Sequence, residues 1–303
     1  IATTPSGLMK LDVLNKNLMP INGALHTKFD QMKLYNNHLI IGLAGEGGSP
    51  PGVQTFDLNN QQFDVGRLIA GLPSNIVNGF DASSNIMYIG TNGGIGRFNY
   101  STSDWMDSIT TSSGLQNNVI EDVLVIGTKA YFATPSGLII WDEITETSTL
   151  MDTSDGLMAT STWGLTSIPA NTPGASPVLV LSHDGRGADR PGVTMIDLGS
   201  MQVISTHRFD QLPSNTVTAL TNDWWGLHIA SDVGPMTHWN ASSTDFEDGI
   251  ASYQTPTWPV DGMMSNGDEL IAFGSTSATL SESRTTGHAR LTSFNQGDIT
   301  DGI

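Results

Sequence analysis

The chain has 303 residues, of which 33 are Gly, 14 are Pro and 14% are charged, and its 38% hydrophobic content is enough for a packed interior, which excludes disorder and collagen. Its 12 Lys and Arg residues against 30 Asp and Glu give a net charge of −18, which repels phosphate backbones and anionic lipid and argues against nucleic-acid partners. The sequence has no Cys, which excludes thiolate catalysis, disulfides and Cys-ligated zinc, and no apolar run long enough to predict direct membrane insertion.

The first element that repeats along the chain is a short strand that opens with Gly and ends five residues later with Asp or Asn. Glycine supplies the positive φ of a tight turn, and Asp or Asn bonds its own backbone to start the next turn. Five copies are predicted, at residues 7–12, 52–57, 94–99, 137–142 and 192–197. Aromatic–Asn pairs at 239–240 and 294–295 mark two more, which makes seven.

A second repeated element joins a turn to the strands that follow it. The Leu-Pro-Ser-Asn turn at 72–75 recurs at 212–215 and, in a looser form, at 115–118. An apolar run downstream of each turn ends on a small residue, with nineteen residues from Gly71 to Gly90 and again from Gly114 to Ala133. The residues between these markers alternate or form β-branched and aromatic runs, which is typical of strands, and no helical period is evident.

Each repeat therefore predicts four antiparallel strands, and Gly71 and Gly114 are 43 residues apart. Four strands at such a period are typical of one blade of a β-propeller. We predict an all-β fold, a seven-bladed β-propeller of four-stranded antiparallel blades whose closing blade is incomplete, as a single domain over residues 1–303. The blade units span approximately residues 1–20, 21–70, 71–113, 114–155, 156–210, 211–254 and 255–303.

The two ends of the sequence indicate that the strand that should close the ring is missing from it. Residues 1–8 match residues 131–138, so the chain is expected to enter at the second strand of a blade. Residues 299–303 are expected in the fourth strand of the last blade, by analogy with residues 246–250. Because propellers often close by pairing strands from both termini, we expect these residues to be part of a longer chain that supplies the missing strand.

The repeat pattern resembles that of a known family. The turn at 72–75 followed by residues 89–99, Ile-Gly-Thr-Asn-Gly-Gly-Ile-Gly-Arg-Phe-Asn, is similar to the propeller repeats of two-component regulators. Such repeats form the extracytoplasmic sensor region of hybrid histidine kinases and parts of assorted surface proteins. The resemblance covers nearly all of the chain and implies a propeller and an extracellular, cell-surface or periplasmic location.

Three insertions point to one face of the predicted propeller. The step from the second to the third strand is four residues in four units, but ten from Gly42 to Gly52 and ten from Ser182 to Gly192. It is thirteen from Gly274 to Gly287. In an up-down blade, all three insertions lie on the face that also bears the Leu-Pro-Ser-Asn turns. Loops on a rigid scaffold are where binding and catalysis concentrate, so this face is the predicted binding face.

Residues in or beside these insertions are the candidate ligand-binding residues. Arginine suits the carboxylates of acidic sugars or of a partner protein. The alternative is that these loops carry only solvated charges. The candidates are Glu46, His183, Asp184, Arg186, Arg190, Arg284, His288 and Trp225.

Tryptophans offer a second route to a binding site, because an exposed ring can stack on a sugar. Trp163, Trp224, Trp225 and Trp258 are the relevant residues, and we expect such side chains to pack in the core between sheets. Trp224 and Trp225 are the exception, since neighbouring strand residues face opposite sides and at least one of the two is expected at the surface.

Catalysis and metal binding remain alternatives. His183 with Asp184 and Asp189 could hold a divalent ion, but the calcium-loop spacing is missing and a solvated loop is preferred. Glu46, His183 and His288 with an arginine could supply acid and base groups for a polysaccharide lyase or hydrolase. No nucleophile or phosphate-loop motif is present, and no cofactor is expected.

The prediction from sequence is a non-catalytic recognition or scaffolding propeller of an exported or cell-surface protein. It would bind a glycan or protein ligand on the face that bears the long loops. The alternative is a polysaccharide-active lyase or hydrolase that uses the same face.

Overall fold

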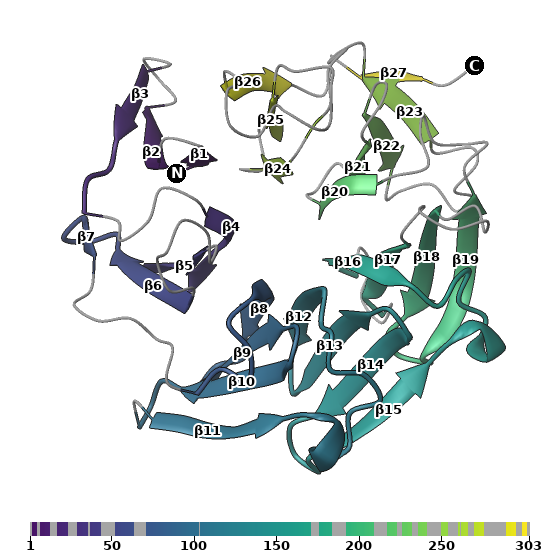
Figure 1. Cartoon of the computed structure of the whole chain (residues 1–303). Helices are drawn as coiled ribbons and strands as arrows, with labels where there is room; N and C mark the ends of the chain where they lie inside the picture. Colours follow the sequence, from purple (N-terminus) through teal and green to yellow (C-terminus); the bar gives the residue numbers. More distant parts are fainter. Residues whose placement is uncertain are drawn as a thin grey trace. The chain divides into compact units, whose positions relative to one another are not determined.

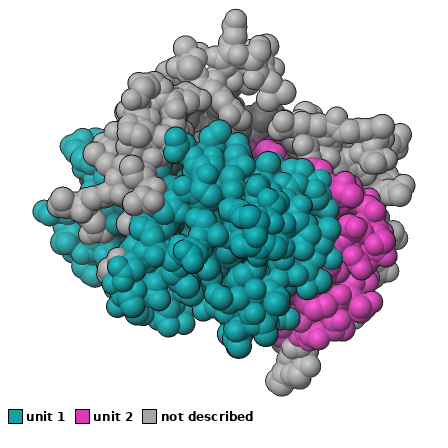
Figure 2. Space-filling model, turned by 60° about the horizontal axis from the view of Figure 1, so that its bottom comes forward, with its two compact units in different colours: residues 1–150 teal, residues 151–303 magenta. Residues whose placement is uncertain are grey.

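The structure is a computed structural model, and it describes residues 2–4, 7–12, 17–23, 29–35, 37–43, 52–63, 71–102, 104–170, 176–183, 192–208, 217–222, 226–231, 236–240, 250–253, 260, 262–265, 270–275, 289–294 and 299–301. The chain divides into two compact units, residues 1–150 and 151–303, which are coloured teal and magenta in Figure 2. The single domain expected over residues 1–303 stays a prediction.

Unit 1 contains four antiparallel sheets whose strands follow one another in chain order (Figure 1). The first sheet has three strands, β1 (Ala2–Thr4), β2 (Gly7–Asp12) and β3 (Asn17–Pro20). The second has four, β4 (Phe29–Tyr35), β5 (His38–Leu43), β6 (Gly52–Asp57) and β7 (Gln62–Phe63). The third has β8 (Val77–Ala82), β9 (Ile86–Thr91), β10 (Gly94–Asn99) and β11 (Asp104–Ile109). The fourth has β12 (Asp122–Ile126), β13 (Lys129–Thr134), β14 (Gly137–Asp142) and β15 (Thr147–Met151).

Unit 2 contains three antiparallel sheets. The first has four strands, β16 (Thr162–Ile168), β17 (Val178–His183), β18 (Gly192–Asp197) and β19 (Gln202–Arg208). The second has five strands, β20 (Val217–Asn222), β21 (Gly226–Ser231), β22 (Thr237–Asn240), β23 (Ile250–Tyr253) and β27 (Ile299–Asp301). The third has three strands, β24 (Gly262–Ser265), β25 (Leu270–Ser275) and β26 (Ala289–Phe294).

The strand plan predicted from sequence is confirmed where its signals are local. All five predicted strands that open with Gly and end with Asp or Asn have the expected bounds, and each is the third strand of a blade or its counterpart in the first sheet. The chain enters at a second strand, because β1 pairs with β2 through Thr4 and Gly7, as Thr134 pairs with Gly137 between β13 and β14. The fold is therefore all-β and built from propeller-type blades.

The predicted number of seven four-stranded blades is wrong. Among the described residues, five sheets contain the four strands of a blade: four have four strands each, and in the fifth β27 is added to β20–β23. The strands β1–β3 and β24–β26 form sheets of only three. The last strand is also misassigned, because β27 pairs with β23 of the preceding sheet, with Tyr253 opposite Ile299, and does not complete the sheet of β24–β26. An outer strand with unpaired backbone groups accepts any extended segment that reaches it, so the strand-forming preference of residues 299–301 does not decide this pairing.

The hydrophobic core lies between consecutive sheets. In unit 1, Tyr88 of β9 and Phe132 of β13 pack in one cluster, with ring centroids 6.2 Å apart. In unit 2, Val180 of β17 and Ile229 of β21 share another cluster. The first strands of neighbouring sheets contact one another as well, β8 with β12 in unit 1 and β16 with β20 in unit 2 (Figure 1). Within each unit, neighbouring sheets thus bury apolar faces against one another, as blades do.

Two neighbouring first strands approach so closely that one position excludes a side chain. A Cβ added to Gly79 of β8 would lie 2.8 Å from the Cα of Asp122, which opens β12. Backbone on the far side cannot move aside as a flexible side chain would. Glycine is therefore required here for packing between two blades.

Short turns punctuate the blades. Two 3₁₀ helices, η1 (Thr111–Ser113) and η2 (Thr153–Asp155), are capped by Thr110 and Asp152 and end in a left-handed glycine. At the end of β14, backbone hydrogen bonds from Thr145 and Ile144 hold the pKa of the Asp142 carboxyl below its ordinary value.

In the part of the chain that is described, no helix is long and apolar enough to cross a membrane.

Candidate functional site

The insertion between β17 and β18 starts from a strand end that differs from its counterparts. In unit 1, β9 and β13 end in Thr91 and Thr134, whose hydroxyls donate to the carbonyls of Gly94 and Gly137 at 2.8 and 2.7 Å. The same hydroxyls accept backbone N–H groups of the turn at 3.0 and 3.1 Å. Threonine thus closes a two-residue turn, and β17 ends at the equivalent position in His183.

His183 holds the two strands together below the insertion. Its Nδ1 lies 3.2 Å from the carbonyl oxygen of Ser161, which only accepts, so Nδ1 carries the proton. Its Nε2 then accepts from the hydroxyl of Thr194 on β18, at 2.7 Å. That hydroxyl in turn accepts from the backbone N–H of Met158 at 3.3 Å. The ring therefore links the segment before β16 to β17 and β18.

The electrostatic setting of His183 keeps the ring neutral. The side chain is 2% exposed, and burial lowers its pKa from 6.5 to about 4, although hydrogen bonds to the carbonyls of Ser161 and Ala159 oppose the shift. A neutral ring matches the tautomer that the two hydrogen bonds require. Both ring nitrogens are engaged inside the blade, so His183 positions the strand ends from which residues 184–191 depart.

Beside His183, the first strand of the same sheet contains a β-bulge. Thr162 pairs with His183, and the register shifts before the next pair, Leu165 with Leu181. The hydroxyl of Ser182 accepts the N–H of Gly164 at 2.9 Å, which fixes the bulge. The side chain at the bulge is Trp163, and it is 41% exposed. The expectation that Trp163 packs in the core is therefore wrong.

The corresponding bulges elsewhere have a different use. In β8 the bulged residue is Asn78, whose Nδ2 donates to the carbonyl of Ile120 at 2.8 Å. In β20 the residue at the bulge is Thr218, whose hydroxyl donates to the carbonyl of Val260 at 2.5 Å. Both acceptors lie 42 residues downstream, just before the next blade's first strand. A polar bulge residue thus links neighbouring blades, whereas β16 has Trp163 in this position.

Most of the candidate site lies outside the described residues. Of the ligand-binding candidates, the structure describes only His183. The candidates outside the described residues are Glu46, Asp184, Arg186, Arg190, Trp225, Arg284 and His288. The divalent-ion hypothesis involves Asp184 and Asp189, which lie outside them too, and within the described part no group of three or more His, Asp or Glu side chains is placed to hold a metal ion.

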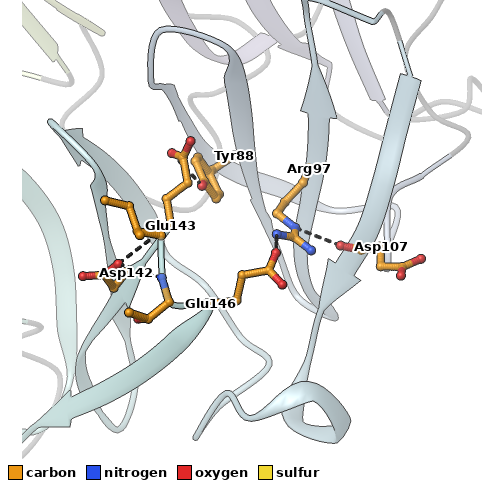
Figure 3. Close-up of polar contacts among 8 residues, drawn as sticks. Tyr88, Arg97, Asp107, Asp142, Glu143 and Glu146 are labelled. Carbon is orange, nitrogen blue, oxygen red and sulfur yellow. Dashed lines mark hydrogen bonds and ion pairs between the residues drawn. The ribbon is translucent and has the colours of Figure 1, made fainter.

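A second polar cluster joins β8–β11 to β12–β15 in unit 1 (Figure 3). The hydroxyl of Tyr88 donates to Glu143 at 3.0 Å, and burial, with the nearby Glu143 carboxylate, raises the pKa of that hydroxyl so that it stays protonated. Arg97 is 8% exposed, donates to the carbonyl of Asp107 at 2.9 Å and pairs with Glu146 at 3.1 Å. Every one of these charges has a partner inside the protein, so the cluster is a structural link between blades.

The comparisons with known proteins support the fold. No protein-family model matches the chain, and no curated protein sequence matches it. Among solved structures, the extracellular domain of the putative one component system BT4673 from B. thetaiotaomicron superimposes with a TM-score of 0.66 at 12% identity, over 88% of this chain and 34% of that one. The extracellular domain of the putative hybrid two component system BT3049 from the same organism gives 0.56 at 11% identity, over 98% and 45%.

A third match is the computationally designed Ika8 protein, with a TM-score of 0.61 at 13% identity, over 89% of this chain and 76% of that one. The likeness is one of fold. The chain spans about a third of the BT4673 domain and less than half of the BT3049 domain. Two of these neighbours are extracellular domains of putative one- or two-component systems, and what they share with this chain is the propeller-type fold, while the particular repeat type stays a prediction.

Proposed function

We propose that this chain is a non-catalytic recognition domain of an extracytoplasmic protein, and that it binds a glycan or protein ligand on the face with the long loops. The observation that carries the proposal is the exposed side chain of Trp163 beside His183, where the inserted loop 184–191 with its Asp and Arg residues begins. Protein scaffolds commonly place binding residues, including exposed aromatic rings, on loops that start from a rigid strand end.

The comparisons support the location and the class. Two of the matching structures are extracellular domains of putative one- or two-component systems. In this proposal, the propeller-type fold of this chain presents a surface to ligands outside the cytoplasm. The charge of −18 agrees with this, since it disfavours nucleic acid and anionic lipid as ligands.

The residues that we propose for recognition are those singled out in the long loops. Arg186 and Arg190 flank the middle of residues 184–191, and a guanidinium binds a carboxylate through two parallel hydrogen bonds. Glu46, Asp184, Arg284, His288 and Trp225 are the further candidates on this face. His183 has a positioning role, because it holds the strand ends from which Asp184 and Arg186 follow.

The engagement of His183 also favours recognition over lyase or hydrolase chemistry. A general base must reach the proton that it abstracts. The Nδ1 of His183 donates to Ser161, its Nε2 accepts from Thr194, and the side chain is 2% exposed. Catalysis through the Nε2 of this histidine would require its hydrogen bond with Thr194 to break and the buried ring to become accessible first.

The proposal is tested by binding and turnover measured on the same protein. Wild type, Arg186→Ala and the control Lys129→Ala, which removes a cation from β13 in unit 1, are applied to an array of neutral and acidic oligosaccharides. We expect binding by wild type and Lys129→Ala, and about tenfold weaker binding of acidic ligands by Arg186→Ala. The same oligosaccharides are followed for new reducing ends. Turnover, or no binding to any glycan or to candidate protein ligands, would overturn the proposal.

A further inference from the structure

The strand β27 pairs with a different sheet from the one that its place in the chain indicates. It follows β26 in the sequence, yet it pairs with β23, where Tyr253 lies opposite Ile299 and Ser252 lies opposite Thr300 (Figure 1). Among the described strands, β26 pairs with β25 alone. The segment that follows β26 therefore lengthens the neighbouring sheet instead of its own.

Five connections earlier in the chain show how a third strand is joined to a fourth in the same sheet. Each third strand ends in Asp or Asn, and four residues separate it from the fourth strand. The fourth strand begins opposite that Asp or Asn, as Gln62 lies opposite Asp57 and Gln202 opposite Asp197. Counted in the same way from Asn295, the last connection would comprise residues 296–299 and would place Thr300 opposite Asn295.

The last residue of such a connection has a left-handed backbone. Gln61, Glu146 and Met201 directly precede β7, β15 and β19, and their φ angles are +56°, +52° and +56°. None of these side chains branches at Cβ, and a β-branched residue is strongly disfavoured in this conformation. The corresponding residue in the last connection is Ile299, which is β-branched. The turn that would join residues 300–301 to β26 is therefore opposed by one side chain.

The pairing with β23 avoids this conflict. Ile299 belongs to β27 there, and extended backbone suits a β-branched residue. The pairing is short, however, because it involves only the three pairs from Ala251 with Asp301 to Tyr253 with Ile299. Few backbone hydrogen bonds are lost when so short a strand leaves an edge, and a second edge can replace them.

We infer that residues 299–301 are an exchangeable strand with two partners, β23 and β26, and that Ile299 holds the strand on β23. In the second arrangement the strand completes the sheet β24–β26 and leaves the outer edge of β23 uncovered. The exchange is a conformational device of the last two sheets in unit 2. It goes beyond the proposed recognition function and needs no ligand.

The experiment reports the partner of the strand through engineered disulfides, which is direct because the chain has no Cys. The first variant, Ser252→Cys with Thr300→Cys, joins residues that lie opposite each other in the structure. The second, Phe294→Cys with Asp301→Cys, joins residues that would lie opposite each other on β26, as Phe56 lies opposite Phe63. Opposite residues of antiparallel strands are within disulfide reach. Equilibration in a glutathione buffer gives the effective concentration of one thiol at the other.

Both pairs are measured with Ile299, with Ile299→Asn and with the β-branched control Ile299→Val. We expect the 252–300 disulfide to be the more stable one when residue 299 is Ile. Asn tolerates the left-handed backbone, so Ile299→Asn should raise the effective concentration for the 294–301 pair by about tenfold and lower that for the 252–300 pair. Ile299→Val should leave both within about twofold. Ile299→Gly, which has no Cβ, is a second variant with the same expected shift as Ile299→Asn.

Three results would overturn the inference. If the 294–301 disulfide is already the more stable one with Ile at residue 299, this residue does not hold the strand on β23. If Ile299→Asn and Ile299→Val shift the two pairs equally, branching at Cβ does not select the edge. If neither Ile299→Asn nor Ile299→Gly changes either pair, the strand does not exchange. All three results leave the proposed recognition function unaffected.

Discussion

The sheets β8–β11 and β12–β15 of unit 1 and the sheet β16–β19 of unit 2 follow the same strand plan but end their second strands differently. Thr91 and Thr134 close two-residue turns with one hydroxyl each. His183, at the same position, reaches across to Thr194 and back to Ser161. In the sheet β16–β19, a larger side chain thus links strands two and three where the two-residue turn is replaced by an insertion.

The same two regions also differ at the bulge of the first strand. Asn78 of β8 donates to Ile120 of the segment leading into the next blade, and so contributes to blade packing. Trp163 of β16 is instead exposed beside the insertion. At the end of the second strand, both kinds of blade have a side chain that links strands. At the bulge of the first strand, β8 has a side chain that links two blades, whereas β16 has a side chain that is 41% exposed.

The largest effect is expected where regular blades pack most closely. Gly79→Val places a side chain 2.8 Å from the Cα of Asp122, which cannot move without separating β8 from β12. We expect a loss of about 3 kcal/mol or more in the free energy of unfolding, measured by urea denaturation. The control is Gly127→Ala, where nothing lies within 4 Å of the added Cβ and a φ of +63° is the only penalty. Its cost should be about 1 kcal/mol, and equal losses in both variants would contradict the packing argument.

The next effect tests whether His183 replaces the turn in the inserted blade. Its pKa is lowered from 6.5 to about 4, so between these values the unfolded chain binds a proton that the folded protein does not. The contribution is complete above pH 6.5 and is lost as the pH falls to about 4. At 1.36 kcal/mol per unit this amounts to about 3 kcal/mol.

The measurement is the free energy of unfolding of wild type and His183→Asn between pH 4 and 7.5. The difference between the two profiles should shrink as the pH falls, because only wild type loses the buried neutral imidazole. Parallel profiles would show that His183 titrates in the same way in the folded and unfolded states, and would contradict its buried role.

The sequence predicts elements well where one or two residues decide the backbone. The strands 94–99 and 137–142 have their predicted bounds because Gly at the start and Asn or Asp at the end are local turn signals. The pairing of β27 with β23 escapes prediction because it depends on which strand edge the segment 299–301 reaches. The strand-forming preferences of segment 299–301 do not determine which edge it pairs with.

The candidate site is harder to predict for a different reason. The bulge in β16 inserts an extra residue, which shifts the alternation of inward and outward side chains, and so Trp163 does not follow a period of two. The structural role of His183 is hard to predict for another reason. His183 directly precedes the inserted residues 184–191, and this place in the sequence suggests a ligand-binding residue. Aligning it with Thr91 and Thr134, which also end second strands, is the sequence signal that indicates a structural role.

A smaller effect is expected in the polar cluster of unit 1 (Figure 3). Tyr88→Phe removes the hydrogen bond to Glu143 and leaves that carboxylate with less compensation, which should cost about 1 kcal/mol in thermal or chemical unfolding. Glu146→Gln tests the exposed end of the same cluster, since the Glu146 side chain is 61% exposed where it pairs with Arg97. This change should cost less than about 0.5 kcal/mol. A larger loss for Glu146→Gln than for Tyr88→Phe would reverse the order that burial predicts.

The smallest effect on stability is expected at Trp163, and it separates the two uses of the bulge. Trp163→Ala removes a ring that is 41% exposed, so we expect the free energy of unfolding to fall by less than about 1 kcal/mol. Asn78→Ala, at the bulge of a regular blade, removes hydrogen bonds to Ile120 and Asn92 and should cost about 1–2 kcal/mol because the Ile120 carbonyl loses its donor. Urea denaturation of both variants in parallel gives the comparison. If Trp163→Ala were the more destabilising of the two, the ring would be acting as a packing residue of the blade, and its exposure would not mark a surface kept for a ligand.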